Sequence, residues 1–298
     1  MQNFECDKGF DQIPSLNWQI RRVRSSDSEV LEDQVVVEEP LEIVVNGESI
    51  AVLMRMPGQE KELATGFCIT EGYVRNAQDI LLIHHCGLGL PAPGEEEGEE
   101  TGSSRNRVEL SVAPKGFQTR EASNSVRLIR SGCGAADVSA MSDALPFVSE
   151  GFSVDASMLL SLGRALRDLQ VVYPKAGGTH AAALFDARGH AIHTAEDIGR
   201  HNAVDKTLGY CFLRKIPLND KILVTSGRAS YEMVTKAVRA GLSVIATLSA
   251  PTSLAVQIAQ DRGLTLIGYL RGSRMNVYTH PQRLREVGIP EGRIDGKV

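Results

Sequence analysis

Residues 221–272 read KILVTSGRASYEMVTKAVRAGLSVIATLSAPTSLAVQIAQDRGLTLIGYLRG, and this stretch decides the fold. Short apolar runs alternate in it with amphipathic runs. The apolar runs predict buried strands and the amphipathic runs predict helices: strands at 221–227, 242–249 and 264–272, helices at 229–240 and 253–262. Strands that alternate with helices pair in parallel within a sheet covered on its faces. The stretch therefore predicts a three-layer α/β domain.

The same rhythm extends upstream. HAAALFD (180–186) and HAIHTAED (190–197) have the pattern of strands, and a helix is predicted over 199–213. We therefore expect the α/β domain to cover residues 150–298.

The first half of the chain has a different pattern. The run VVVEEPLEIVVNGESIAVLMRMPG alternates in hydrophobicity around Asn46-Gly47, which is a strong hairpin signal. It predicts strands at 41–46 and 49–55. A helical run ending near Gly72 follows, with Cys68 on its apolar face. Residues 34–130 are expected to form a small α+β domain.

The remaining segments are predicted to be irregular. Residues 1–33 are polar and mixed in charge, so we expect a poorly ordered lead-in. Residues 91–106 are rich in Glu, Pro, Gly and Ser and predict a mobile loop. Residues 131–149 form a cysteine loop and a linker between the two domains.

Composition excludes several classes of function. The chain has 298 residues and a net charge of −5, which argues against binding nucleic acid over a broad face. No run approaches the roughly 18 apolar residues of a membrane span, and no secretory signal is recognisable. We therefore expect a cytoplasmic protein that has no membrane association. The five cysteines show no CxxC pair, so we expect reduced thiols and no metal site.

Cys133 is the candidate nucleophile. It lies in RLIRSGCGAAD, where small residues allow a partner to approach the sulfur closely. Arg127 and Arg130 lie just upstream, and nearby cations favour the reactive thiolate. From these residues alone, a spectator thiol in a glycine-rich linker is an equally good interpretation.

Charged residues cluster where the helix over 199–213 begins. Arg200 and His201 fall in its first turn, where free backbone N–H groups attract anions. Asp197 is a reasonable cap. The simpler interpretation, a capped helix with an internal ion pair, accounts for Asp205 and Lys206 but not for the rest of the cluster. His180 precedes a buried strand after two glycines and is a further candidate.

Two loops follow predicted strands at the edge where open α/β sheets bind ligands. TSGRAS (225–230) contains Ser226, Gly227 and Arg228, and LSAPTS (248–253) is its neighbour. Each loop alone would more often be a helix cap than a binding loop. After the last strand come residues that could bind phosphate oxygens with forked arginine bonds: Tyr269, Leu270, Arg271, Gly272, Ser273 and Arg274.

The sheet pattern is also compatible with a zinc deaminase, but the sequence argues against one. That signature needs His-x-Glu followed by Pro-Cys-x-x-Cys. The nearest match, His193 to Glu196, has the wrong spacing, and no cysteine pair follows it.

Taken together, these segments resemble the FdhD family, the formate dehydrogenase accessory sulfurtransferases. The motifs that carry the resemblance include RSGCG, GGTHAAALFDARG, EDIGRHNAVDKTLG, SGRAS, SAPTSLAV and NVYTHP, and the matching stretches span about residues 36–284. The resemblance implies that the C-terminal domain is cytidine deaminase-like without the zinc, and that the protein is a homodimer.

The resemblance also implies a function. The family accepts persulfide sulfur from a cysteine desulfurase and delivers it to the molybdenum bis(molybdopterin guanine dinucleotide) cofactor, which activates the formate dehydrogenase catalytic subunit. Cys133 would then carry the persulfide. The segment from Tyr269 to Arg274 matches the one that contacts the cofactor with its guanine nucleotide moiety.

One position departs from the family pattern. Where the family has a second loop cysteine, this chain has Ala136. A disulfide relay within the loop is therefore impossible, although one thiol is enough to hold a persulfide. The departure leaves open a binding chaperone for the cofactor or the apo-enzyme that has no covalent role.

Overall fold

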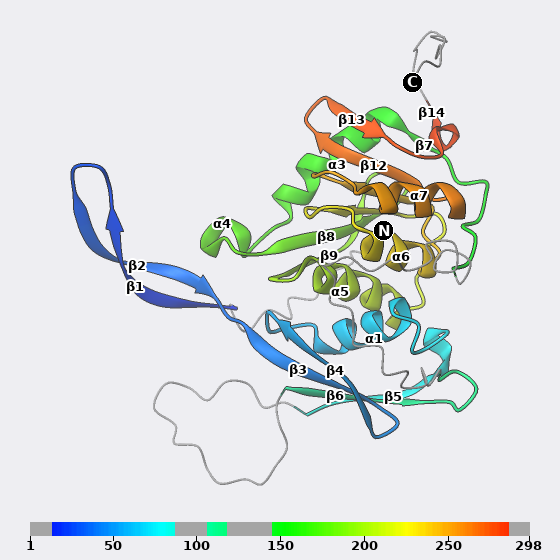
Figure 1. Ribbon diagram of the computed structural model, residues 1–298, viewed down its shortest axis with the longest axis horizontal. Coiled ribbons are helices and arrows are strands. Elements are labelled where there is room, and N and C mark those ends of the chain that lie inside the picture. The colour runs from blue at the N-terminus through cyan, green and yellow to red at the C-terminus, as the bar shows by residue number, and fades with distance from the viewer. Residues whose placement is uncertain (1–13, 87–105, 118–144, 286–298) are drawn as a thin grey trace, which may run out of the picture.

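The computed structural model describes residues 14–86, 106–117 and 145–285. In this part of the chain, a small four-stranded domain lies below a larger α/β domain, and a two-stranded ribbon projects from the side (Figure 1). No helix in the described residues is long and apolar enough to cross a membrane.

The ribbon corrects the expectation of a poorly ordered lead-in. Strand β1 (Ser15–Val23) pairs antiparallel with β2 (Ser28–Val36) over its whole length. Charged residues interrupt the alternation of apolar and polar side chains in both strands, and this concealed the strand pattern in the sequence.

The small domain contains the predicted hairpin and helix. The turn between its first two strands has positive φ at both Asn46 (50°) and Gly47 (84°), as the Asn-Gly pair predicts. Cys68 is fully buried in the core of this domain, as expected. The sheet order is β4-β3-β6-β5. The elements are β3 (Glu39–Val45), β4 (Glu48–Arg55), α1 (Glu60–Thr70), η1 (Ala77–Asp79), β5 (Ile80–Cys86) and β6 (Arg107–Val112).

The larger domain is built on a six-stranded sheet of order β13-β12-β11-β10-β8-β9. Helices α5, α6 and α7 pack on one face and α3 on the other, which confirms three layers. The main elements are α3 (Ala156–Asp168), α4 (Tyr173–Ala176), β8 (His180–Phe185), β9 (Ala191–Asp197), α5 (Arg200–Leu213), β10 (Ile222–Thr225), α6 (Tyr231–Arg239), β11 (Val244–Thr247), α7 (Ser253–Arg262), β12 (Thr265–Arg271) and β13 (Arg274–Val277). Shorter elements complete it: β7 (Val154–Asp155), η2 (Pro281–Arg283) and β14 (Leu284–Arg285).

The expectation of parallel pairing holds only for the centre of this sheet. Strands β10, β11 and β12 are parallel, whereas β8, β9 and β13 run antiparallel to their neighbours. The connection between β8 and β9 is a tight turn in which Asp186 Oδ1 accepts hydrogen bonds from the backbone N–H groups of Arg188 and His190. So short a connection can join only antiparallel strands.

The two domains meet where α1 crosses α5. A Cβ atom added at Gly66 would lie 1.9 Å from the backbone oxygen of Asp205, and one added at Gly209 would lie 1.8 Å from that of Glu62. Only glycine permits this approach of the two backbones, so the two glycines set the position of α5 against the small domain.

Candidate functional site

The predicted ligand-binding segments converge at one edge of the larger sheet. Three hydrogen bonds between successive loops hold them together. The Ser226 N–H donates to Ala181 O (2.9 Å), the Leu248 N–H to Thr225 O (3.0 Å), and the Tyr269 N–H to Ser249 O (2.9 Å). The loops that follow β10, β11 and β12 therefore lie side by side, next to the start of β8.

His180 and the β10–α6 loop form the centre of this edge. His180 Nδ1 lies 3.2 Å from Ser226 Oγ, which also accepts a hydrogen bond from the Ala181 N–H (3.0 Å). Burial, followed by the positive charges of Arg200 and His201, lowers the pKa of His180 below its ordinary value. His180 is therefore neutral at pH 7 and can donate or accept a proton.

Arg200 lies against the same loop, because Gly227 has no side chain. A Cβ atom at Gly227 would lie 3.0 Å from both Cβ and Cδ of Arg200 and 3.5 Å from His180 Nδ1. Arg200 Nε is buried and has no hydrogen-bond partner among the described residues. The loop is held in place by Thr225 and Thr247, whose hydroxyls donate to Gly227 O.

His201 is held by a residue that the sequence analysis missed. Its Nε2 lies 3.3 Å from Glu232 Oε2, at the start of α6. The Ser230 hydroxyl also donates to Glu232 Oε2 (3.1 Å). The hydrogen bond from His201 and its charge outweigh partial burial and lower the pKa of Glu232 to about 2. The sequence signal for Glu232 was the Ser-x-Glu pattern that begins at Ser230, the last residue of the SGRAS loop.

The β12–β13 hairpin completes the edge. Its two-residue turn, Gly272-Ser273, makes Arg271 and Arg274 directly opposed partners, so their side chains share one face. Arg271 Nε donates to Leu248 O (2.9 Å), and its guanidinium lies 6.0 Å from the centre of the Tyr269 ring.

The end of β12 is irregular in a way that is common beside functional sites. The register shifts between Gly268 and Arg271, and Tyr269 has a φ of 52°, which a bulky residue rarely adopts. The irregularity separates neighbouring side chains, leaving Tyr269 partly exposed and Leu270 fully buried in the core beneath the sheet. Leu270 was predicted to bind the cofactor, but the structure places its side chain in the core and leaves it unexposed.

The charge at this edge differs from that of the whole chain. Four arginines of the edge make no ion pair with any of the described residues: Arg200, Arg228, Arg271 and Arg274. These four arginines form a locally basic surface in a chain of net charge −5. Such a surface suits an anionic ligand that offers phosphate oxygens.

The rest of the charged cluster at the start of α5 joins the two domains. Lys206 Nζ lies 2.7 Å from Asp197 Oδ2 and donates to Met56 O (2.8 Å). Asn202 Nδ2 donates to Met54 O (2.8 Å) and to Asp197 Oδ1 (2.9 Å). The sequence predicted that the side chain of Asp197 caps α5. In the structure this side chain instead joins α5 to the small domain.

A second buried pair involves Asp205, the residue of α5 that precedes Lys206. Lys236 Nζ lies 2.9 Å from Asp205 Oδ2 and 2.7 Å from Glu71 Oε1. The Thr70 hydroxyl donates to Asp205 Oδ1 (2.7 Å). The expected ion pair within the helix is therefore wrong, because Asp205 pairs with α6 and with the end of α1.

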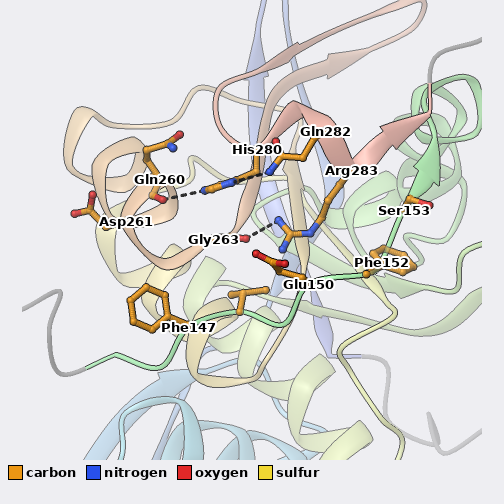
Figure 2. Close-up of a pocket in the computed structure, with 12 residues that line it drawn as sticks. Phe147, Glu150, Phe152, Ser153, Gln260, Asp261, Gly263, His280, Gln282 and Arg283 are labelled. Atoms are coloured by element: carbon orange, nitrogen blue, oxygen red, sulfur yellow. Dashed lines mark hydrogen bonds between the residues drawn. The ribbon is translucent and has the colours of Figure 1, made fainter.

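A separate cavity of about 770 Å³ lies at the opposite end of β12 (Figure 2). Its polar groups bind one another: Arg283 Nη2 donates to Ser149 O (3.1 Å), and His280 Nε2 lies 2.9 Å from Gln260 O. None of the predicted site residues lines it. These contacts join η2 to Ser149 and His280 to α7.

Cys133 lies outside the described residues. Of the other cysteines, Cys68 and Cys211 are buried and unpaired with any described cysteine. Burial raises the pKa of the Cys68 thiol and raises that of Cys211 to about 12. Neither is a thiolate at neutral pH, so neither can serve as a nucleophile. No group of three or more His, Cys, Asp or Glu side chains in the described ranges could hold a metal ion.

Known proteins are similar to this chain over most of its length. The sequence model of the FdhD/NarQ family matches residues 36–285. The chain is 42% identical over 275 residues to a protein of Mycobacterium bovis named sulfur carrier protein FdhD, covering 89% of this chain and 97% of that one. A protein of the same name from Sulfolobus acidocaldarius is 39% identical over 254 residues, covering 85% and 92%.

A solved structure agrees as well. The crystal structure of a protein from Desulfotalea psychrophila, described as a formate dehydrogenase accessory protein, superposes with a TM-score of 0.70 at 25% identity. The match covers 91% of this chain and 99% of that one. The chain belongs to the FdhD/NarQ family.

Proposed function

We propose that this protein is a sulfur carrier required for formate dehydrogenase activity. It takes persulfide sulfur from a cysteine desulfurase onto Cys133 and passes it to the molybdenum bis(molybdopterin guanine dinucleotide) cofactor before insertion. The observation that supports this most directly is the basic edge. Its arginines suit the diphosphate groups of a guanine dinucleotide, and the relatives are named sulfur carriers.

The first chemical step uses one thiolate. The sulfur of Cys133 attacks the terminal sulfur of the desulfurase persulfide, a new S–S bond forms, and the desulfurase cysteine leaves as a thiolate. Cys133 then holds the persulfide. Delivering this sulfur as sulfide requires two electrons, which another thiol, a reductant or the acceptor itself supplies, because position 136 is alanine.

In this proposal, residues at the edge of the larger sheet bind the cofactor that receives the sulfur. Arg271, Arg274 and the loop at 226–228 bind phosphate oxygens, and Tyr269 offers a ring for stacking. His180, neutral at pH 7, is the group suited to move a proton, and His201 orders the pocket through Glu232. The proposal extends to a cytoplasmic homodimer whose larger domain is cytidine deaminase-like, and to the formate dehydrogenase catalytic subunit as client.

A labelling experiment tests the proposal. The protein is incubated with a cysteine desulfurase and cysteine that carries labelled sulfur, then separated without reductant. We expect wild type to retain label and Cys133→Ala to lose it. The matched controls Cys6→Ala and Cys86→Ala should retain it.

The outcome also decides between the two functions. Equal label on wild type and Cys133→Ala, or none on either, rules out the carrier. In that case, binding of a guanine nucleotide by the unlabelled protein would support the chaperone without covalent chemistry, to which Ala136 points.

A further inference from the structure

The hydroxyl of Ser226 is held between strand β8 and the ring of His180. The Ser226 N–H donates to Ala181 O (2.9 Å), and the Ala181 N–H donates in return to Ser226 Oγ (3.0 Å). His180 Nδ1 lies 3.2 Å from the same oxygen. Because both hydrogen bonds to Ala181 involve its backbone, the sheet itself fixes the position of this hydroxyl.

Only one direction of the hydrogen bond between Ser226 and His180 gives the hydroxyl proton an acceptor. Ser226 Oγ already accepts the Ala181 N–H, and Nδ1 is its one other hydrogen-bond partner in the described part of the chain. If Nδ1 carried the ring proton, the hydroxyl proton would have no acceptor among these residues. The hydroxyl therefore donates to Nδ1. A neutral imidazole carries one proton, so that proton lies on Nε2.

The ring is also kept neutral, as this tautomer requires. Burial, followed by the charges of Arg200 and His201, lowers the pKa of His180 below its ordinary value. Arg200 is held close to the ring, because its Cβ and Cδ pack on Gly227, and a Cβ atom at Gly227 would lie 3.5 Å from His180 Nδ1. A cation in this position opposes a second proton on the ring.

The other ring nitrogen is available to a ligand. His180 is partly exposed, and its Nε2 has no hydrogen-bond partner within the described ranges. A neutral imidazole with its proton on Nε2 can donate a hydrogen bond to an anionic atom without becoming charged. It cannot act as a base through Nδ1, since the Ser226 hydroxyl occupies that lone pair.

We propose that Ser226 is a positioning residue, whose hydroxyl holds His180 in the tautomer protonated on Nε2, and that this N–H donates to an anionic oxygen of the ligand bound at the edge. The contact with the ligand rests on the proposed function, whereas the tautomer does not. Within the loop at 226–228, Arg228 is then the side chain left to bind phosphate oxygens. The role of His180 narrows from moving a proton to donating a hydrogen bond.

Nitrogen NMR of the full-length protein, labelled on histidine, reads the tautomer at pH 7, because protonated and unprotonated ring nitrogens differ in chemical shift. The His180 signals are assigned by their absence in His180→Phe. We expect the proton on Nε2 in the wild type and in Ser226→Thr, which keeps a hydroxyl. In Ser226→Ala both nitrogens should move toward intermediate shifts as the two tautomers exchange. The matched control Ser161→Ala, exposed on α3, should keep the wild-type spectrum.

Binding of GDP, measured by calorimetry, separates positioning from direct contact. His180→Phe removes the N–H and should weaken binding about tenfold. Ser226→Ala should weaken it no more than about twofold, because about half of the rings still carry their proton on Nε2. A serine that itself bound a phosphate oxygen would cost about tenfold on removal.

Each part of the proposal has a result that overturns it. A wild-type His180 protonated on Nδ1 removes the tautomer. A tenfold loss in Ser226→Ala assigns the hydroxyl to the ligand instead, and unchanged affinity in His180→Phe removes the ring from the ligand. A wild type that does not bind GDP removes the ligand contact together with the proposed cofactor site, while the spectrum of the free protein still decides the tautomer.

Discussion

Two charged regions, one at the junction of the domains and one at the edge of the larger sheet, have side chains that behave in opposite ways. At the junction of the domains every charge has a partner: Lys206 with Asp197, and Lys236 with Asp205 and Glu71. At the edge of the sheet, Arg271 and Arg274 are exposed and make no ion pair with a described residue. Paired buried charges fix a structure, whereas unpaired exposed cations are available to a ligand.

The junction should lose most when a single partner is removed. In Lys236→Met, Asp205 is left buried without its cation, which should lower the free energy of unfolding by about 3–5 kcal/mol. Burial by itself would lower the pKa of Lys236, but Asp205 and Glu71 raise it, so the lysine is charged in the wild type. Urea unfolding measures the loss.

The matched control for this substitution is Lys61→Met, at an exposed position on α1. It should change stability by less than about 0.5 kcal/mol. A loss of less than about 1 kcal/mol in Lys236→Met would mean that the pair is not structurally important.

Gly209→Ala should lower the free energy of unfolding by about 3 kcal/mol or more, because the added Cβ would overlap the backbone of Glu62 and push the domains apart. Gly163→Ala should lower the free energy of unfolding by a smaller amount, because its Cβ would lie farther from the nearest backbone atom, 2.7 Å from Leu270 O. Thermal unfolding ranks the two variants, and the reverse order would contradict the close crossing of α1 and α5.

His193 should make the junction sensitive to acid. Its ring stacks on Tyr210 at 3.7 Å, and burial, followed by the charge of Arg214, lowers its pKa to about 4. Between this value and the ordinary value of 6.5 the unfolded chain binds more protons than the native one. Stability from this group is therefore complete above pH 6.5 and is lost as the pH falls toward 4, by about 3 kcal/mol.

Substitution isolates this contribution. His193→Gln should flatten the dependence of the unfolding free energy on pH between 7 and 4.5, whereas His190→Gln, in an exposed turn, should keep the wild-type slope. If both variants keep the wild-type slope, His193 is not the acid-sensitive group.

A substitution at the edge of the larger sheet should have the smallest effect on stability. Arg271→Ala is expected to change the free energy of unfolding by less than about 0.5 kcal/mol but to weaken the binding of GDP about tenfold, because a charge-assisted contact is lost. Calorimetric titration measures the affinity. Arg164→Ala, on exposed α3, is the control that should retain it. Unchanged affinity in Arg271→Ala would remove this hairpin from the binding site.

Local patterns predicted most of the elements, and their failures have physical reasons. The Asn46-Gly47 turn, helix α5 and strands β10 to β12 follow from backbone preferences and hydrophobic period, which act over a few residues. The β8–β9 pairing was mispredicted as parallel because the short turn at 186–190 decided it. The β1–β2 ribbon was missed because charged residues interrupt the alternation of apolar and polar side chains in both strands.

The sequence by itself determined the family, the alternation of strands and helices in the larger domain, and which loops lie at the candidate edge of the sheet. These depend on residue type and spacing. Only the tertiary structure decided the role of each charge near α5. Asp197 and Asp205 join the domains because their partners in the small domain, the Met56 N–H and the Thr70 hydroxyl, lie 141 and 135 residues away along the chain, at separations that no local pattern records. Arg200 faced the edge because Gly227 left room for it.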